Sequence, residues 1–504
     1  MIANLSARGA ERPTGIQQLN SENGEISEQS CHENTKLTPT PQRIFLWTQL
    51  LVALAVSMAM MLNGFAFGYT SNAIPSMLNS TWEVYSSDKI VTVGSSIPLA
   101  AIVGSLLGGP LITYVGRRYS IMGAGVPFFI GWILIASATN SSMLLTGQVL
   151  CGVCTGVLST ALLVYIVETI QPEVRGALGL LPLAFRYSGI FLARHAEAYL
   201  DWSEMAYIGA ALSIIYFLLM LSTPESPRWY IAKGRTQNAR KALQWLRGKN
   251  YNVENEIEEL TQFQIEADKT KGIALQHIFS IKYIPAVFIS LSLIVLQQLS
   301  GSHYVFYTLT TTRISGVTAD VQLFAIIIEV LSVISIFVAV VLIERIGRKT
   351  LLYISSASMI FSIVTLGVFV YIQRFNDNLS VEWFPQACCA LYVFGLSMGF
   401  GSIPFLMLGE ILPLKIRDTA ASLIIGVDWA CTFYVTNSLY YNRISYTVIG
   451  GALLMFIIIQ VVAILFVIFC VPETRSKSLE EIELNLTQRL KDNRQAVDAN
   501  AEGI

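Results

Sequence analysis

Long runs of apolar residues, separated by short polar segments, dominate the chain from about residue 44 onward. These runs lie at roughly 44–70, 91–113, 119–139, 143–166, 177–199, 204–222, 281–306, 322–343, 350–372, 386–408, 418–440 and 446–470. A helix of about 20 residues is about 30 Å long, which matches the hydrocarbon thickness of a bilayer. The pattern predicts an all-α membrane protein with twelve transmembrane helices.

Composition agrees with a bilayer as the solvent. Hydrophobic residues make up 53% of the chain and charged residues 13%, whereas about a quarter of a soluble domain is charged. The net charge of −1 gives no reason to expect a nucleic-acid partner. No nucleotide-binding loop occurs, so we expect no ATP or other cofactor. The cysteines lie mostly within the apolar runs, where packing is a commoner role than metal binding, and no metal site is predicted.

Polar segments divide the chain into parts. We expect residues 1–43 to be a disordered cytoplasmic N-terminal tail, 223–280 a cytoplasmic central loop with short helices, and 471–504 a cytoplasmic C-terminal tail. Two six-helix halves, 44–222 and 281–470, lie between them. We expect the protein to be a monomer.

The C-terminal tail contains apolar residues at helical spacing: Leu479, Ile482, Leu486 and Leu490. They predict a short amphipathic helix. Such a helix either packs on the cytoplasmic face of the protein or lies on the membrane.

The distribution of Lys and Arg predicts the orientation. Nearly all of them follow the even-numbered spans, so those loops and both termini are expected in the cytoplasm of a plasma-membrane protein. Two of the remaining loops carry N-x-S/T triplets, at Asn79 and Asn378. These asparagines are candidate glycosylation sites, although such triplets also arise by chance.

Three charged signatures occur twice, each copy about half the chain from the other. Gly-Arg-Arg at 116–118 is matched by Gly-Arg-Lys at 347–349, a glutamate seven residues before an arginine recurs at 168 and 410, and Pro-Glu recurs at 224 and 472. The residues around these signatures that could pair are Arg117, Arg118, Glu168, Arg175, Glu225, Arg228, Glu344, Arg345, Arg348, Lys349, Glu410, Arg417 and Glu473. The chain is therefore two copies of one unit.

Two matched halves in a membrane predict alternating access, in which the halves rock about a site near the midplane. The repeated charges could latch the halves together by ion pairs that break when that side opens. The alternative is that these arginines only set the topology.

Motifs at corresponding places carry a resemblance to a known family. They are Gly-Arg-Arg after the second span, Tyr165-x-x-Glu168 with Arg175-Gly176 after the fourth, Pro-Glu-Ser-Pro-Arg-Trp at 224–229 after the sixth, Gln297-Gln298-x-Ser300-Gly301 in the seventh, Glu344-Arg345-x-Gly347-Arg348-Lys349 after the eighth and Pro472-Glu473-Thr474 after the twelfth. Over about 44–485 the chain resembles the sugar porter family of the major facilitator superfamily. The stretches Glu168–Gly176 and Gly409–Pro413 are most similar to the insect facilitated trehalose transporter subgroup. The resemblance implies two pseudo-symmetric six-helix halves and facilitative transport of a sugar, a hexose or trehalose.

The same resemblance implies a substrate site. Its expected members are Gln297, Gln298, His303, Ser332, Phe405, Asp428 and Trp429. Amides and an aromatic face suit a ring of hydroxyls. Helix packing is the alternative role for the glutamines and for Trp429. The tenth span is expected to kink at Gly399-x-Gly401-x-x-Pro404.

Charges inside the spans are unusual. Arg186 interrupts the fifth span and Glu329 lies in the eighth, although intramembrane charges are costly and tend to be functional. We expect Arg186 to point into the cavity and to pair with Asp428 or Glu329.

Thr70 follows Phe-Gly-Tyr in the first span, where proton-linked members of the family carry Asp. Threonine holds no exchangeable charge, so the resemblance implies a uniporter. Asp428 is an intramembrane carboxylate, which leaves two roles open: coupling to protons, or pairing with a cation. No enzymatic activity is expected. Two other functions stay open: a sugar sensor that does not transport, and a carrier of an organic ion with the same fold.

The two Gly-Arg signatures are unequal. The family's acid before the first one is replaced by Thr113, whereas the second keeps Glu344. The sequence therefore predicts a looser latch on the N-terminal half.

Overall fold

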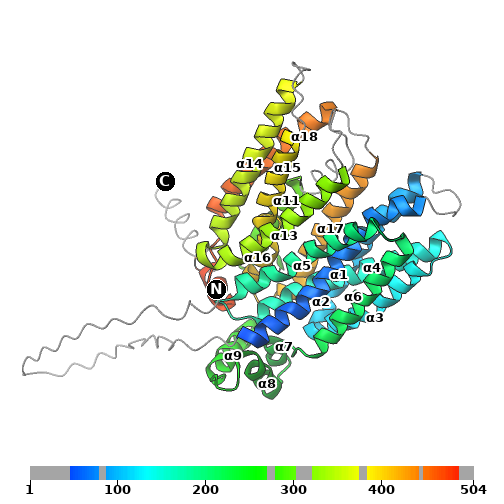
Figure 1. Ribbon diagram of the computed structural model, residues 1–504. Coiled ribbons are helices and arrows are strands. Elements are labelled where there is room, and N and C mark those ends of the chain that lie inside the picture. Colours follow the sequence, from blue (N-terminus) through cyan, green and yellow to red (C-terminus); the bar gives the residue numbers. More distant parts are fainter. Residues whose placement is uncertain are drawn as a thin grey trace, which may run out of the picture. The chain divides into compact units, whose positions relative to one another are not determined.

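The computed structural model describes residues 46–78, 87–269, 278–301, 321–373, 383–441, 446–486 and 488. Within these ranges the regular elements are all helical (Figure 1). Ten helices there are long and apolar enough to cross a membrane, and two shorter apolar helices, Ile284–Leu299 and Leu454–Phe469, accompany them.

The helices follow the predicted apolar runs. The N-terminal half has α1 (Leu46–Leu78), α2 (Ser87–Tyr114), α3 (Arg117–Ala136), α4 (Ser141–Thr169), α5 (Arg175–Glu197) and α6 (Trp202–Leu221). The C-terminal half has α11 (Ile284–Leu299), α13 (Val321–Ile346), α14 (Arg348–Gln373), α15 (Trp383–Met398), α16 (Ile403–Ile411), α17 (Arg417–Tyr441) and α18 (Tyr446–Phe469). Because α15 and α16 together form one apolar span, the predicted count of twelve is consistent with the structure.

The break between α15 and α16 lies where glycines and a proline predicted it. The chain leaves helical geometry at residues 399–402 and resumes at Ile403, with Pro404 in the first turn of α16. Proline is accommodated there because the first amides of a helix need no partner within it. The seventh span likewise ends at Leu299, and Gly301 has a positive φ of 91°.

Small residues set the distance between α1 and α5. A Cβ on Gly64 would overlap the carbonyl oxygen of Arg186, and one on Gly189 would overlap the carbonyl oxygen of Met61. The two backbones can approach this closely only because both positions lack a side chain. This contact fixes the depth and rotation of α5.

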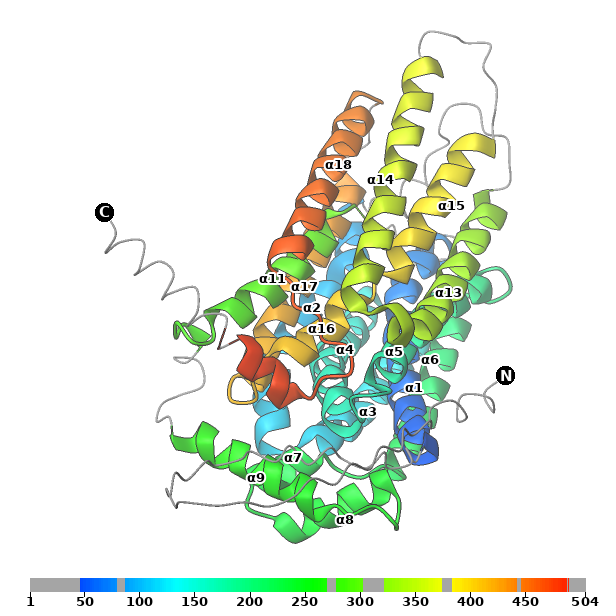
Figure 2. The same ribbon diagram turned by 90° about the vertical axis from the view of Figure 1, so that its left-hand side faces the viewer.

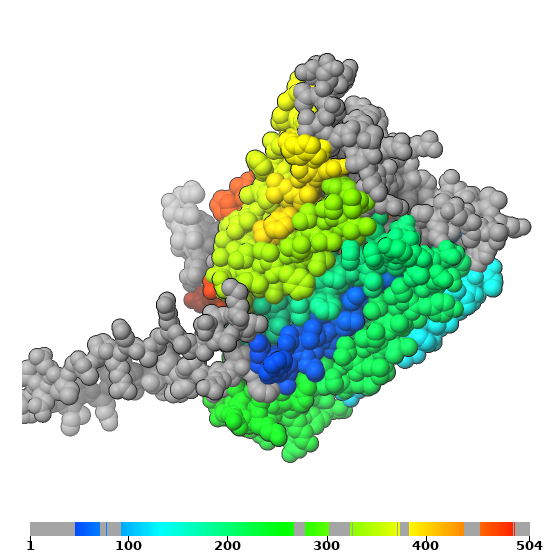
Figure 3. Space-filling model, viewed as in Figure 1, coloured from blue at the N-terminus to red at the C-terminus, as the bar shows by residue number. Residues whose placement is uncertain are grey.

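The two halves meet chiefly along two helix pairs, α2 with α17 and α5 with α13, and α4 also contacts α16 and α17. The second pair is visible in Figures 1 and 3, where the surface of α13 adjoins that of α5. Each pair joins the second span of one half to the fifth span of the other, as expected for two matched units.

Three short helices, α7 (Pro227–Ala232), α8 (Thr236–Arg247) and α9 (Glu254–Lys269), follow α6 and gather at one end of the bundle (Figure 2). They share a small core of Ile231, Leu243, Val253 and Ile257. The short helices predicted for this segment are α8 and α9, whereas α7 was not predicted, because six residues carry too little periodicity.

A further helix at 479–486 follows the last span. Leu479 and Ile482 are 3% and 2% exposed and belong to the main core or its edge, so this helix packs against the protein. Leu490 lies outside the described residues. Of the two roles open for the amphipathic segment, packing is the one found.

We predict that Gly64→Ala destabilises the protein, because the new methyl group has to displace backbone of α5. The cost is expected to be about 1–3 kcal/mol, seen as a lower melting temperature of the protein purified in detergent. Gly123→Ala is the matched control on α3, since a Cβ there would meet no atom within 4 Å. Equal melting temperatures for the two variants would contradict this packing account.

Candidate functional site

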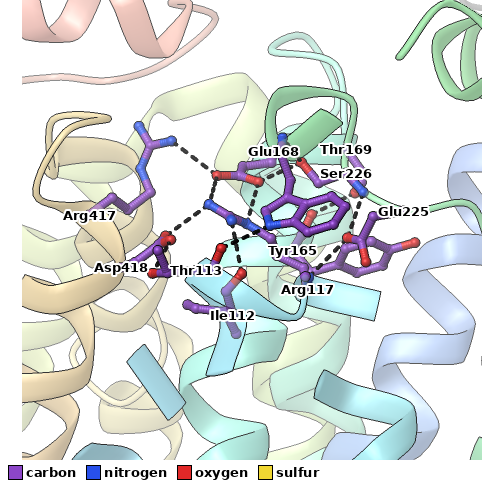
Figure 4. Close-up of polar contacts among 12 residues, drawn as sticks. Ile112, Thr113, Arg117, Tyr165, Glu168, Thr169, Glu225, Ser226, Arg417 and Asp418 are labelled. Atoms are coloured by element: carbon purple, nitrogen blue, oxygen red, sulfur yellow. Dashed lines mark hydrogen bonds and ion pairs between the residues drawn. The ribbon is translucent and has the colours of Figure 1, made fainter. Parts of the chain in front are cut away.

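The first Gly-Arg corner is built around Arg117, in the first turn of α3. Its Nε and Nη2 donate to the two carboxylate oxygens of Glu168 on α4, both at 3.0 Å. Nη2 also lies 2.9 Å from Oδ1 of Asp418, in the first turn of α17 (Figure 4). Because α17 belongs to the other half, this ion pair joins the two halves.

Glu168 is fully buried at its side chain and is held from three directions. Besides Arg117, Ser226 donates to it at 2.5 Å, and Nη1 of Arg417 lies 3.6 Å from its Oε1. Figure 4 shows Arg417, Glu168, Arg117 and Asp418 as a chain of alternating charge. A buried carboxylate requires such partners, since an unpaired one costs several kcal/mol.

The second corner repeats the plan in the C-terminal half. Arg348 is fully buried at its side chain and pairs with Glu410 at 3.3 Å and with Glu344 at 3.2 Å. Thr474 donates to Glu410 at 2.6 Å, as Ser226 does to Glu168. Across the interface, the Ala177 amide donates to Oε1 of Glu344 at 3.2 Å.

Two further glutamates cap the helices that start at the corners. Glu225 accepts hydrogen bonds from the amides of Arg117 and Arg118 at 3.0 Å, and Glu473 accepts from those of Arg348 and Lys349 at 3.1 and 3.0 Å. An anion is stabilised there by the unpaired amides and the helix dipole. Burial nevertheless raises the pKa of Glu225, outweighing the amides that favour its charged form.

The other predicted latch residues have different roles. Arg118 donates to the Leu221 carbonyl at 2.8 Å and Lys349 to the Ile468 carbonyl at 2.9 Å, each holding the last span of its own half. Arg345 contributes its carbonyl, which accepts from Arg475 at 2.7 Å. Among the described residues, no ion pair across the halves involves these three.

Arg175 and Arg228 complete this end of the bundle, here called the charged end. Nη1 of Arg175 donates to the Lys477 carbonyl at 3.2 Å rather than to a carboxylate. Arg228 pairs with Glu480 of the helix at 479–486. Burial would raise the pKa of Glu480, but its pairing with Arg228 outweighs this and lowers the pKa to about 2.

Sequence reasoning missed Ser226, Asp418, Thr474 and Glu480. A signal existed for three of them: Ser226 and Thr474 follow the repeated Pro-Glu directly, and Asp418 follows Arg417. Asp418 also changes the expectation at Thr113, since the acid lost from α2 is supplied by α17. An ion pair therefore binds the first corner across the interface, whereas the sequence had predicted a looser latch on the N-terminal half.

Polar residues of the predicted substrate site come together between α11, α16 and α17. Gln298 donates to Asp428 and, at 3.3 Å, to Thr432. Gln297 donates to the Gly401 carbonyl at 3.1 Å, in the break between α15 and α16. Its Oε1 and the Nε1 of Trp429 are buried with no hydrogen-bond partner among the described residues.

Arg186 does not make the expected ion pair. Its guanidinium lies over the ring of Trp429, 5.9 Å from the centroid, and its buried Nε has no hydrogen-bond partner among the described residues. Glu329 pairs instead with Arg194, two turns further along α5, at 2.8 Å. Asp428 is engaged by Gln298. The cause is the position of α5, which places Arg194 rather than Arg186 opposite Glu329.

The remaining site residues are less connected. Ser332 is buried and donates to the Ile328 carbonyl of its own helix at 2.9 Å, and Phe405 is buried in α16. His303, Asn79 and Asn378 lie outside the described residues.

Comparison with known proteins identifies the class. The family model described as "Sugar (and other) transporter" matches residues 51–486. The chain belongs to this family, which is one of multi-pass membrane transporters.

Particular relatives and structures refine the comparison. The chain is 52% identical to the facilitated trehalose transporter Tret1 of Bombyx mori, over 92% of this chain and 91% of the relative. It is 47% identical to Tret1 of Apis mellifera ligustica, over 86% and 87%. Among solved structures, the proton:xylose symporter XylE bound to 6-bromo-6-deoxy-D-glucose has a TM-score of 0.78 at 22% identity, covering 88% of this chain and 99% of that one. The last comparison shows the major facilitator fold.

We predict that Glu480→Gln weakens the charged end, because it leaves the Arg228 guanidinium buried without its counter-ion. The expected loss is about 1–3 kcal/mol, measured as a fall in melting temperature at pH 7. Since the folded pKa of about 2 lies below the 4.5 of an unperturbed glutamate, this stability is complete at neutral pH and is lost as pH falls through about 2.

Glu481→Gln is the control for this prediction, because Glu481 is exposed one residue away. An equal effect of the two changes would show that the Arg228–Glu480 pair contributes nothing specific.

Proposed function

We propose that the protein is a facilitative sugar transporter that carries a hexose or trehalose across the plasma membrane by alternating access. The observation that carries the proposal is the closure of one end of the bundle by ion pairs between the halves, Arg117 with Asp418 and Arg417 with Glu168. Family membership and the facilitated trehalose transporters among its relatives support the substrate class.

Alternating access requires contacts that hold one end closed and can be released. Ion pairs and hydrogen bonds suit this, because water replaces each partner when the end opens. An apolar seam would expose its surface to water instead, at about 25 cal/mol for each Å². The charged end therefore has the chemistry of a reversible gate.

The substrate site is proposed on α11, α16 and α17, where two buried polar atoms have no hydrogen-bond partner in the part of the chain that the structure describes. The free Oε1 of Gln297 accepts a hydrogen bond and the Nε1–H of Trp429 donates one. A sugar hydroxyl both donates and accepts, so it satisfies either atom. We assign Gln298, Asp428, Ser332, Phe405 and His303 to the same site.

Transport without proton coupling is favoured by Thr70. This residue is buried in α1, and its hydroxyl lies 3.1 Å from the Ala66 carbonyl of the same helix. A threonine hydroxyl does not titrate near neutral pH, so this position carries no proton through the cycle.

Orientation and organisation follow from charge. We place the charged end, the segment 223–280, and both tails, 1–43 and 471–504, in the cytoplasm, because the arginines gather there. The six-helix halves then run over 44–222 and 281–470. Asn79 and Asn378 would face outward for glycosylation, and the proposed unit is a monomer.

A second candidate function is the carriage of an organic anion. Arg186 lies within a span and makes no direct ion pair among the described residues. Asp428 attracts its guanidinium over a longer distance, and the buried Nε keeps a donor with which an anion could pair. A sugar sensor is the remaining alternative, since binding alone also requires this site.

Uptake into proteoliposomes separates these functions. We predict uptake of labelled trehalose or glucose down its gradient, unchanged by an imposed proton gradient, and no uptake of labelled glucuronate. Stimulation by the proton gradient would contradict uniport, and glucuronate uptake would favour the anion carrier. Sugar binding without uptake would favour the sensor.

Gln297→Ala tests the site in the same assay. Losing the acceptor and the donor to Gly401 is expected to weaken apparent sugar affinity by roughly tenfold, since a hydrogen bond contributes about 0.5–1.5 kcal/mol and 1.4 kcal/mol is a factor of ten. Gln244→Ala is the control, because that amide caps the end of α8 at the surface by bonding the Lys249 carbonyl. Unchanged affinity in Gln297→Ala would remove this residue from the site.

A further inference from the structure

The halves meet at two equivalent places, here called crossings, and two repeated sequence positions meet at each of them. Four residues before each corner arginine lie Thr113 and Glu344, and directly after Arg175 and Arg417 lie Gly176 and Asp418. In the structure Thr113 meets Asp418, and Glu344 meets the start of α5 at Gly176 and Ala177. Each crossing is thus formed by one position of each kind, taken from opposite halves.

At the second crossing the carboxylate comes from the position four residues before the corner arginine. Glu344 projects from α13 and accepts from the Ala177 amide at the start of α5. A Cβ on Gly176 would overlap Oε1 of Glu344, so the glycine leaves room for that carboxylate. The other oxygen pairs with Arg348 at 3.2 Å.

At the first crossing the carboxylate comes instead from the position directly after Arg417. Asp418 projects from the start of α17, and its Oδ2 lies 2.9 Å from the hydroxyl of Thr113 on α2. Its Oδ1 lies 2.9 Å from Nη2 of Arg117. The side chain of Asp418 is only 16% exposed, so this pair is largely shielded from water.

Each crossing therefore holds one carboxylate at the start of a helix and beside a corner arginine. The carboxylate belongs to the helix that starts there at the first crossing, and to the helix that meets it at the second. One carboxylate is favoured there, because the helix start and the guanidinium both attract an anion. A second would meet the first at hydrogen-bond distance, where like charges repel.

The close approach of α2 and α17 explains why a short aspartate is long enough. A Cβ on Gly109 would lie 2.6 Å from Oγ of Ser422, and one on Gly426 would lie 3.2 Å from Oγ of Ser105. These small residues lie one and two turns from the crossing, so the two backbones are in near contact. At the other crossing Val340 occupies the position equivalent to Gly109, and the longer Glu344 spans the gap.

We propose that Asp418 is the gating acid of the first crossing. It supplies from α17 the carboxylate that the repeat would place on α2, at the position of Thr113. Its carboxylate locks α2 and α3 to α17 while the charged end is closed. Release of this crossing breaks an ion pair between the halves, whereas release of the second breaks the bond from Ala177 to Glu344. This role rests on the proposed alternating access and adds a gate residue to it.

The test is a double-mutant cycle that converts the first crossing into a copy of the second. Thr113→Glu introduces the acid of Glu344, and Asp418→Gly introduces the glycine of Gly176. Opening is measured by the labelling rate of Ser422→Cys, a position 3% exposed on α17, with a membrane-impermeant thiol reagent applied to the charged end. Each labelled protein is compared with the same variant lacking this cysteine.

We expect each single change to raise the labelling rate roughly tenfold, an effect of about 1.4 kcal/mol. Thr113→Glu does so by setting two carboxylates against each other, and Asp418→Gly by leaving Arg117 only Glu168. The double variant is expected to return to within about twofold of the wild-type rate. Additive effects in the double variant would overturn the proposal.

Two isosteric controls separate charge from bulk. Thr113→Gln adds the same volume as glutamate without charge and is expected to label more slowly than Thr113→Glu, whereas Asp418→Asn keeps the size and is expected to match Asp418→Gly. Wild-type behaviour of Asp418→Asn would overturn the role of the charge. Since labelling needs no substrate, a wild-type protein that fails to take up sugar would refute the transport proposal without affecting this cycle.

Discussion

Two buried carboxylates, Glu168 and Glu410, are the constraint on which the charged end depends. Neither can stay ionised away from water unless several donors surround it. Each is met by a corner arginine and a hydroxyl from its own half, and Glu168 also by Arg417 of the other half. The sequence meets this demand twice, which is why the same charged signatures recur half a chain apart.

The same constraint supports the proposal that this end is a reversible gate. In such a gate, a carboxylate paired across the interface would lose that partner on opening, and water would enter at that moment and solvate both ions. The free energy of opening is therefore the difference between two solvated arrangements, which is small compared with either desolvation term. Close backbone contacts elsewhere, such as α1 against α5 at Gly64 and Gly189, contain no ion pair that water could replace and are suited to staying closed.

Much of the fold could be predicted from the sequence, because apolar runs and helix breakers act locally. The spans follow from the lengths of the apolar runs, and the break at 399–402 follows from glycines and a proline. Partners of isolated charges could not be predicted in the same way. Arg186 and Arg194 both lie on α5, and the depth of that helix, set by glycine contacts with α1, decides which one meets Glu329. The role of Asp418 was not predicted, because the equivalent residue in the other half is Gly176. That the carboxylate comes from α17 at one crossing and from α13 at the other is visible only in the structure.

The ion pairs at the charged end hold the two halves together, and the distance between spin labels on either side of them reports whether they do. Ser222, at the end of the N-terminal half, and Ser476, directly after the last span of the C-terminal half, are both exposed and can carry the labels in a protein whose other cysteines are replaced. We predict a single short distance for the wild type and an added longer population in Glu168→Gln, where Arg117 and Arg417 lose their shared carboxylate. Identical distributions in the two proteins would contradict it.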